Sequence, residues 1–550
     1  MVMNRDEEIP GRKPRKLLRL ICPAYPTFNI YSAQARVTTA LGPICVGTSV
    51  HELPSWDVEV IDENNYHYGP RGPDGKPDHE AIQRSRHADV VGLYGGLTST
   101  IPRLYDIARL YGRMGIKTIA GGQHFVENHI EEALNRGIGV IVKGEGERAI
   151  VELLPKLVAG EDLSSVAGLA YLDGGRVVQT PDRVLMTDFD SLPIPDFSIL
   201  RYAKMKIFPI TGVRGCGMDC EFCTVKGKPR FATPRRIMAQ FASAHEKHRA
   251  KRFFLVDDLF GQNRRETIEL CELLRDYQAD MSVSFSITVQ IRLDKARDTE
   301  LLTAMRQANI KTLAIGFESP IAAELQAMNK RLDPARMIEL TGLYRKAGFH
   351  IHGMFIFGYP LPAGASFDMP VRERIRRFQR FIRKAHIDTL QVLLPVPLPG
   401  TELTHRLRDQ GRLLPKQFVG LEYYDGNFPL FEPDKPLTCE TLQAAARLIM
   451  RRFYRPMHMV NVAMNILAFP SLVFCLHRLR VGWARWRRRW WNSIYRTGGW
   501  FIVRRWTAAF KKDAFLAKLA QAKRRIHSQA HTLADHHGPD TDSRHIARQG

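Results

Sequence analysis

Short apolar runs alternate with amphipathic stretches along most of this 550-residue chain, and this alternation constrains its fold more than any other feature. A first block of runs lies at 17–22, 58–62, 89–93, 117–120 and 139–143, and a second lies at 207–210, 252–256, 282–288, 311–315, 350–357 and 389–394. Strands that alternate with helices form parallel sheets whose ligand sites lie at the carboxyl ends of the strands. The sequence therefore predicts an α/β protein, with a Rossmann-like domain followed by six β/α units that fit a partial barrel.

The stretch between the two blocks marks the predicted domain boundary. Residues 169–178 form a predicted hairpin, and the two prolines in 188–195 resist helix formation and predict an extended linker. We predict seven segments in chain order: a basic leader at 1–16, a Rossmann-like domain at 17–160, the hairpin and linker at 161–200, a partial barrel at 201–410, a helical domain at 411–477, a basic Trp/Arg-rich segment at 478–528 and a disordered tail at 529–550.

Three cysteines with C-x3-C-x2-C spacing, Cys216, Cys220 and Cys223, follow the first strand of the second block. Thiolate is the soft ligand that iron–sulfur clusters require, and three thiolates can hold three irons of a [4Fe–4S] cluster while the fourth iron stays open to an outside ligand. A zinc site or a redox disulfide would need a further paired motif. The other cysteines are scattered singly, at Cys22, Cys45, Cys271, Cys439 and Cys475. The spacing therefore favours a catalytic cluster.

Glycine-containing turns follow three strands of the first block, at 95–100, 121–124 and 144–147. Glycine lets the backbone approach a large ligand, and nearby hydroxyls and amides can bind its polar tail. The candidate ligand-binding residues in these turns are Thr98, Ser99, Gly121, Gly122, Gly144 and Glu145. Each turn alone is more often structural.

The cysteine motif and the ordered glycine turns before it resemble the B12-binding-domain-containing radical S-adenosylmethionine (SAM) family, which includes hopanoid methylases and the anaerobic magnesium-protoporphyrin ester cyclase. The resemblance spans 17–450. It implies that Cys216, Cys220 and Cys223 hold a [4Fe–4S] cluster, that the open iron binds SAM and cleaves it to a 5′-deoxyadenosyl radical, and that the first domain binds cobalamin. The loop at 23–29 lacks the D-x-H-x-x-G motif, so cobalamin without a histidine ligand is implied, and His124 is not expected to bind cobalt.

The resemblance also implies roles for residues at the strand ends of the second block. It assigns Glu318, in the turn that begins at Gly316, to contacts with SAM, places Asp258 at the mouth of the active site, and gives Gly358 a part in shaping the backbone around SAM. A carboxylate at a strand end could instead cap a helix. Tyr359 is a candidate for proton or hydrogen transfer, although a lone aromatic residue is more often a packing residue.

The formal net charge of +23 is concentrated near the C-terminus. Residues 478–525 hold fifteen Lys or Arg against one acid, and six of the seven tryptophans follow residue 482. The uncharged run at 460–476 is short for a membrane-spanning helix, which needs about twenty apolar residues. Trp and Arg together suit the surface of an anionic membrane. Nucleic acid binding and a solvated helical cap are the alternatives, and the apolar run favours the membrane.

The resemblance implies a cobalamin-dependent radical SAM enzyme, and we predict that it methylates an unactivated carbon of a hydrophobic substrate. A radical SAM enzyme that cyclises or rearranges its substrate is one alternative, and a nucleic-acid-modifying methylthiotransferase is another, although the remaining cysteines offer no second triad. We expect an electron donor such as flavodoxin or ferredoxin. Eight cysteines without a framework of regularly spaced pairs, together with the absence of a secretory signal, predict a reducing cytoplasm, with attachment to the inner face of the membrane.

Overall fold

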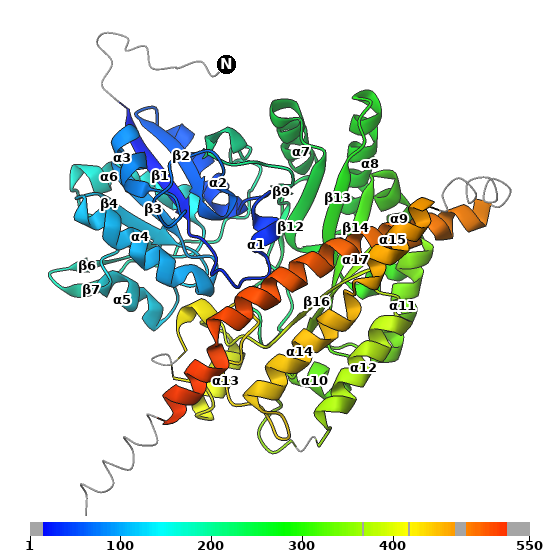
Figure 1. Cartoon of the computed structure of the whole chain (residues 1–550). Helices are drawn as coiled ribbons and strands as arrows, with labels where there is room; N and C mark the ends of the chain where they lie inside the picture. Colours follow the sequence, from blue (N-terminus) through cyan, green and yellow to red (C-terminus); the bar gives the residue numbers. More distant parts are fainter. Residues whose placement is uncertain (1–14, 366–367, 416–418, 468–479, 525–550) are drawn as a thin grey trace, which may run out of the picture.

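The structure, a computed structural model, describes residues 15–365, 368–415, 419–467 and 480–524 (Figure 1). Its first sheet has eight strands in the order β7-β6-β5-β4-β3-β1-β2-β8. The strands are β1 (Lys16–Cys22), β2 (Trp56–Asp62), β3 (Val90–Tyr94), β4 (Lys117–Gly121), β5 (Val140–Val142), β6 (Leu169–Asp173), β7 (Arg176–Gln179) and β8 (Leu200–Arg201). All neighbours are parallel except those that involve β6 or β7. Across the sheet, strands β2-β1-β3-β4-β5 are neighbours in this order, so the direction of winding reverses between β1 and β3. In such sheets the ligand crevice lies at this reversal.

Helices cover both faces of this sheet because its strands are apolar on both sides. Helices α2 (Leu41–Ser49) and α6 (Gly146–Ala159) pack together on one face. On the other face lie α4 (Ile101–Arg113) and α5 (Asn128–Asn135), and α3 (His79–Ser85) follows β2. The core on the α2 and α6 side continues into the second domain. The two domains are therefore packed together by apolar side chains.

The second sheet has six parallel strands in chain order, with β9 at one edge and β16 at the other. They are β9 (Phe208–Ile210), β12 (Arg252–Phe260), β13 (Ser286–Ile291), β14 (Ile310–Glu318), β15 (His350–Ile356) and β16 (Thr389–Leu393). The helices are α7 (Pro234–His248), α8 (Arg264–Asp280), α9 (Thr299–Gln307), α10 (Ala322–Ala327), α11 (Pro334–Lys346), α12 (Val371–Lys384) and α13 (Glu402–Asp409). This arrangement confirms the predicted α/β class with a partial barrel; the limits of the seven segments stay a prediction.

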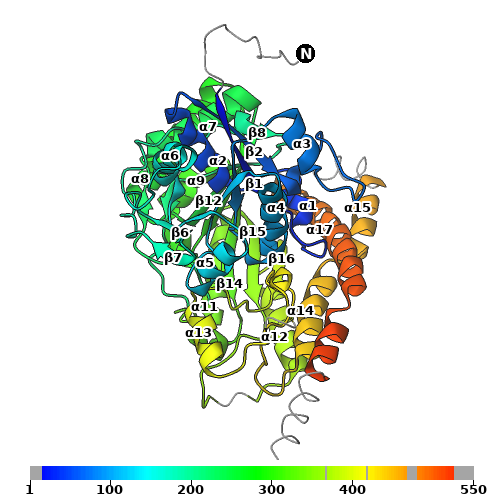
Figure 2. The ribbon, with the colours of Figure 1, turned by 90° about the vertical axis from the view of Figure 1, so that its left-hand side faces the viewer.

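One sequence expectation for an individual element differs from the structure. The strand predicted at 282–288 begins only at Ser286, because α8 continues to Asp280 and the chain then turns at Met281 and Ser282. The linker predicted as extended at 188–195 contains no helix or strand, and the chain after it forms β8, which pairs in parallel with β2. The first domain therefore gains a strand from the segment that leads into the second. The first domain lies to the left in Figure 1 and faces the viewer in Figure 2.

Helices α14 (Cys439–Phe453), α15 (Met457–Leu467) and α17 (Arg480–Asp513) follow the barrel. Helices α14 and α17 lie side by side in Figures 1 and 2. The basic segment is attached to the barrel through its own cations: Arg488 donates to buried Asp388 at 2.8 Å, and Arg496 donates to the carbonyl of Ile387 at 2.8 Å. Several charges of the predicted membrane-binding segment therefore bind protein.

No helix within the described ranges is long and apolar enough to cross a membrane. The run predicted as a borderline span at 460–476 lies outside these ranges from residue 468 onward. Most of the predicted basic leader, Cys475 and the predicted tail at 529–550 also lie outside them.

Candidate active site

The three motif cysteines share one loop, which the short antiparallel strands β10 (Val213–Arg214) and β11 (Arg230–Phe231) close at its neck. Gly215, at the start of the loop, has a φ of +86°, and a Cβ there would lie 2.6 Å from the carbonyl oxygen of Lys228. Only glycine fits this position without displacing backbone. The Gly217 N–H donates to the Gly227 carbonyl at 2.9 Å, which draws the two sides of the loop together.

All three thiols are half-buried and free of disulfide bonds. Burial raises the pKa of Cys216, Cys220 and Cys223, so iron must displace protons from them when it binds. Across the described part of the chain, no group of three or more His, Cys, Asp or Glu side chains is placed to hold a single metal ion. In a [4Fe–4S] cluster, each thiolate binds a different iron.

A buried ion pair supports the loop from behind. Glu221, between the second and third cysteines, accepts hydrogen bonds from Tyr359 Oη at 2.6 Å and from Arg406 Nη2 at 2.9 Å. Tyr359 is only 1% exposed and packs with Met328 and Leu403. The structure thus places Tyr359 against the cluster loop, and its proposed part in proton or hydrogen transfer stays a prediction.

Glu318 ends β14 in a left-handed conformation with a φ of +59°. Its Oε1 accepts a hydrogen bond from Lys330 Nζ at 2.7 Å, and a Cβ at Gly316 would meet the same oxygen at 2.4 Å. Burial lowers the pKa of Lys330, but Glu318, Cys220 and Cys216 raise it more, so the ammonium stays charged. A carboxylate beside an ammonium can bind both charged ends of an amino acid. Lys330 is the partner of Glu318 that the sequence analysis missed, and the predicted contacts of Gly316 and Glu318 with SAM stay a prediction.

The two aspartates at the end of β12 hold the backbone that leads into the cysteine loop. Asp257 accepts from the N–H groups of Gly212 and Val213 at 2.5 and 2.9 Å, and burial raises its pKa to about 6. Asp258 accepts from the Gly215 N–H at 2.8 Å, and burial raises its pKa as well. Neither residue caps the following helix, because Asn263 is the N-cap of α8.

A cavity of about 670 Å³ lies between the two domains and brings several predicted residues together. Gly121, Gly122, Gly144 and Glu145 line it from the ends of β4 and β5, and Gly215 and Asp258 line it from the cluster side. Its apolar wall runs between the first sheet and helices α2 and α6, and is formed by Leu20, Leu41, Val46, Ile119, Val142 and Ile150. Gly144 has a φ of +72°, and a Cβ there would meet nothing within 4 Å. The cavity therefore fits a large ligand with one polar and one apolar portion.

Five predicted cofactor-contact residues, Thr98, Ser99, Gly316, Glu318 and Gly358, are absent from the described lining of this cavity. Thr98 and Ser99 are buried in the 3₁₀ turn Thr98–Thr100, which packs against Leu421–Tyr423, and Thr98 Oγ1 lies 3.2 Å from His124 Nδ1. Gly358 supports α14, because a Cβ there would lie 2.2 Å from Leu442 Cδ1. Contacts of these five residues with a cofactor stay a prediction.

Known proteins that resemble this chain include radical SAM proteins. Residues 210–362 match the family model of the radical SAM superfamily. The anaerobic magnesium-protoporphyrin IX monomethyl ester cyclase of Cereibacter sphaeroides is 29% identical over 333 residues, which cover 58% of this chain and 51% of that protein. The hopanoid C-2 methylase of Rhodopseudomonas palustris is 30% identical over 243 residues, which cover 43% of this chain and 44% of that protein. The chain spans about half the length of these two curated relatives.

The radical S-adenosylmethionine methyltransferase TsrM of Kitasatospora setae, solved with cobalamin and a [4Fe–4S] cluster bound, is similar in fold. Superposition of the two structures has a TM-score of 0.59 at 15% sequence identity, and the match covers 73% of this chain and 76% of the TsrM chain. The partial barrel and the α/β domain before it therefore have the fold of a cobalamin-dependent radical SAM protein. Residues 210–362 form a radical SAM domain, and the chain resembles B12-binding-domain-containing radical SAM proteins, as its motifs predict.

Proposed function

We propose that this chain is a cobalamin-dependent radical SAM enzyme that methylates an unactivated carbon of a hydrophobic substrate. The observation that carries the proposal is the shared cavity. The neck of the cysteine loop lines it at Arg214 and Gly215, and the glycine turns of the first domain line its other side. Two cofactors held on these two sides would therefore act on one enclosed substrate.

The residues present suit each cofactor. Cys216, Cys220 and Cys223 would hold the [4Fe–4S] cluster, the Glu318 and Lys330 pair would bind the amino acid end of SAM, and the turns containing Gly121 and Gly144 would hold cobalamin. When bound, the cluster supplies one electron to SAM and cobalamin supplies the methyl group. The chain's own part is placement: Asp258 fixes the backbone at Gly215, and the apolar cavity wall excludes water from a reactive radical. Flavodoxin or ferredoxin would serve as the electron donor.

The names of the relatives support a hydrophobic substrate, since one acts on a hopanoid and the other on a protoporphyrin ester. They also keep cyclisation open as an alternative. The test incubates reconstituted enzyme with SAM, a reductant and a lipid extract, and follows product mass. Methylation predicts a product heavier by one CH₂ together with 5′-deoxyadenosine. A product that has lost hydrogen without gaining carbon contradicts methyl transfer and supports cyclisation.

Substitution Tyr359→Phe tests whether Tyr359 supports the loop or transfers protons. The variant loses one hydrogen bond to Glu221 but keeps the bond from Arg406. We expect the free energy of unfolding to fall by about 1 kcal/mol and SAM cleavage to stay within about twofold of the wild type. Denaturant unfolding and 5′-deoxyadenosine formation measure the two effects. The control is Tyr277→Phe on α8, which loses an exposed hydrogen bond to Glu246. Loss of cleavage with unchanged stability would support proton or hydrogen transfer instead.

The outer surface of α15 and α17 supports a further proposal, attachment to an anionic membrane. Apolar side chains are exposed at Met457, Met459, Val460, Met464, Ile466, Leu467, Trp483, Trp491, Tyr495, Phe501 and Ile502. Exposed cations accompany them at Arg487, Arg489, Arg504 and Arg505. Interfacial indoles together with arginines suit an anionic lipid surface. By contrast, Trp506 is 4% exposed and belongs to the core.

Vesicle flotation tests this attachment. We expect the full chain to float with vesicles of phosphatidylglycerol and phosphatidylcholine, and not with phosphatidylcholine alone. Because Trp491 is 47% exposed, Trp491→Ser should lower partitioning about tenfold. The control Tyr68→Ser removes an aromatic that is 69% exposed on the first domain. Equal flotation of Trp491→Ser and the wild type would contradict the assigned surface.

A further inference from the structure

The glycine turn after β5 and the neck of the cysteine loop are joined by a compact charge network. Arg214 and Arg230 are register partners in the β10–β11 ladder, so two positive charges face each other where the loop closes. Like charges directly opposite in an antiparallel pair destabilise it. Glu145 relieves this repulsion, because its Oε1 accepts from Arg214 Nη1 at 3.1 Å and from Arg230 Nη2 at 2.8 Å.

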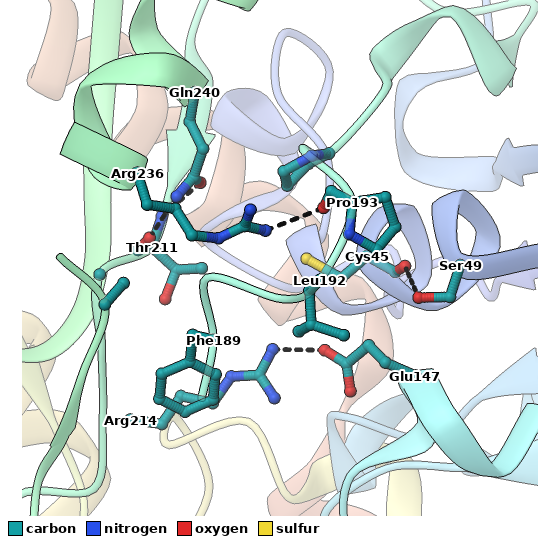
Figure 3. A pocket seen from close by; sticks show the side chains of 13 residues that line it. Cys45, Ser49, Glu147, Phe189, Leu192, Pro193, Thr211, Arg214, Arg236 and Gln240 are labelled. Carbon is teal, nitrogen blue, oxygen red and sulfur yellow. Dashed lines mark hydrogen bonds and ion pairs between the residues drawn. The ribbon is translucent and has the colours of Figure 1, made fainter. Parts of the chain in front are cut away.

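A second carboxylate and the linker complete the network. Glu147 accepts a short hydrogen bond from Arg214, drawn in Figure 3. The Met186 N–H donates to Glu145 Oε2 at 3.0 Å, and the Met186 carbonyl accepts from Arg230 at 2.5 Å. The Phe189 ring lies 5.0 Å from the Arg214 guanidinium and 5.4 Å from that of Arg230. Three segments that are distant in sequence therefore meet at two arginines.

The network is shielded from water on the linker side. Glu147 is 5% exposed and Glu145 is 16% exposed. A cavity of about 30 Å³, large enough for about one water molecule, separates the network from Cys45, Arg236 and Gln240 (Figure 3). Burial raises the pKa of Glu145, but Arg230, the Met186 N–H and Arg214 lower it more, and the net shift is downward. The carboxylate is therefore charged at neutral pH, and removing it would leave two partly buried cations facing each other.

We propose that Glu145 and Glu147 are positioning residues that hold the neck of the cysteine loop in a fixed position against the first domain. We call this set of contacts the lock. Glu145 is thereby assigned to the protein's own arginines, in place of the cofactor contact that the sequence suggested. The consequence for catalysis rests on the proposed function: a cluster and a cobalamin that share one substrate require a fixed separation. The lock would fix this separation, because it joins two parts of the same cavity lining. These are the turn at Gly144 and Glu145 and the loop neck at Arg214 and Gly215.

Amide hydrogen exchange on the full chain tests the lock without any cofactor. Glu145→Gln keeps the shape and removes the charge, so amides in 213–231 should exchange about tenfold faster than in the wild type. The matched control is Glu152→Gln on α6, whose partner Arg183 also comes from the linker but lies away from the loop neck. This control should exchange as the wild type does. Unchanged exchange of 213–231 in Glu145→Gln would overturn the lock.

A second variant keeps the test valid if the first one misfolds. Arg230→Gln removes one of the two opposed charges, and the double variant Glu145→Gln/Arg230→Gln should exchange more slowly than the sum of the two single effects predicts. Additive effects would show that the two side chains do not act together, and would overturn the proposal.

Pulsed electron paramagnetic resonance then measures the consequence in enzyme loaded with iron, sulfide and hydroxocobalamin. We expect a single narrow distance between Co(II) and the reduced cluster in the wild type, and a broader distribution in Glu145→Gln at equal cobalt content. Loss of hydroxocobalamin with unchanged exchange would make Glu145 a cofactor contact and overturn the lock. If the wild type binds no hydroxocobalamin, the proposed function fails, while the exchange experiment still decides on the lock.

Discussion

Replacement of Cys220 by alanine is expected to abolish reductive cleavage of SAM. The three motif cysteines share one loop, and two thiolates cannot replace three as the protein ligands of a [4Fe–4S] cluster. We expect the iron content after reconstitution to fall to background and 5′-deoxyadenosine formation to fall at least about a thousandfold. Iron analysis and chromatography of the nucleoside measure the two quantities.

Cys271→Ala is the matched control for this substitution. Cys271 is buried in α8 and belongs to the core of the partial barrel. Its loss should lower the free energy of unfolding by about 1 kcal/mol through a small cavity, while iron content and SAM cleavage stay at the wild-type level. Cleavage that survives in Cys220→Ala would contradict the assignment of the cluster to this loop.

Replacement of Lys330 by methionine is expected to weaken SAM binding about a hundredfold, because a charge-assisted contact worth about 3 kcal/mol is lost. Methionine keeps much of the side-chain volume and leaves Glu318 without the cation that lies 2.7 Å from it. The pKa of Lys330 is raised, so the wild-type residue is charged throughout the neutral range and the effect should not vary with pH there. The change that SAM produces in the resonance spectrum of the reduced cluster measures the affinity.

Lys311→Met provides the control, since Lys311 is at the opposite end of the same strand, β14, and its side chain is exposed. It should bind SAM as the wild type does. Lys330→Met enzyme that retains its cluster and binds SAM with unchanged affinity would contradict the placement of the amino acid end of SAM at Glu318 and Lys330.

The fold was predictable where apolar runs are continuous, because both faces of a parallel sheet are buried. Strand β1, for example, is buried along almost its whole length. Helices α2 and α6 gave no comparable signal. Gly42, Pro43 and Gly47 lie within α2, and Pro155 lies within α6. These residues disfavour a helix in isolation, and tertiary packing between the sheet and the barrel overrides that preference.

The site was predictable where its residues are close in sequence. The cysteine motif and the turn at Gly316 and Glu318 are local patterns, so their spacing carries the chemistry. Lys330 reaches Glu318 only after the chain has passed through α10. Glu145 and Arg230 are 85 residues apart, and their contact depends on the register of a two-residue ladder. The periodicity of apolar residues in the sequence does not predict such contacts, because they arise only from the tertiary structure.

The basic C-terminal segment shows the same limit for charge patterns. Its composition indicates an affinity for anionic surfaces, but it does not reveal which cations the protein itself uses. Asp388 accepts hydrogen bonds from both Arg488 and Arg345. Burial raises the pKa of Asp388, but His350 and the two arginines lower it more, so this pKa is well below its ordinary value. This buried carboxylate, far from the segment in sequence, attaches α17 to the barrel.

The central claim is that one chain holds both a cluster and cobalamin, and the corrinoid content of the enzyme tests it most directly. The full chain is purified anaerobically, reconstituted with iron, sulfide and hydroxocobalamin, and freed of unbound cofactor. Absorption spectra and extraction of the corrinoid then follow, with Cys220→Ala in parallel. We expect a cluster and one cobalamin per chain in the wild type, and cobalamin without a cluster in the variant. A wild-type enzyme with a full cluster and no retained cobalamin would contradict it.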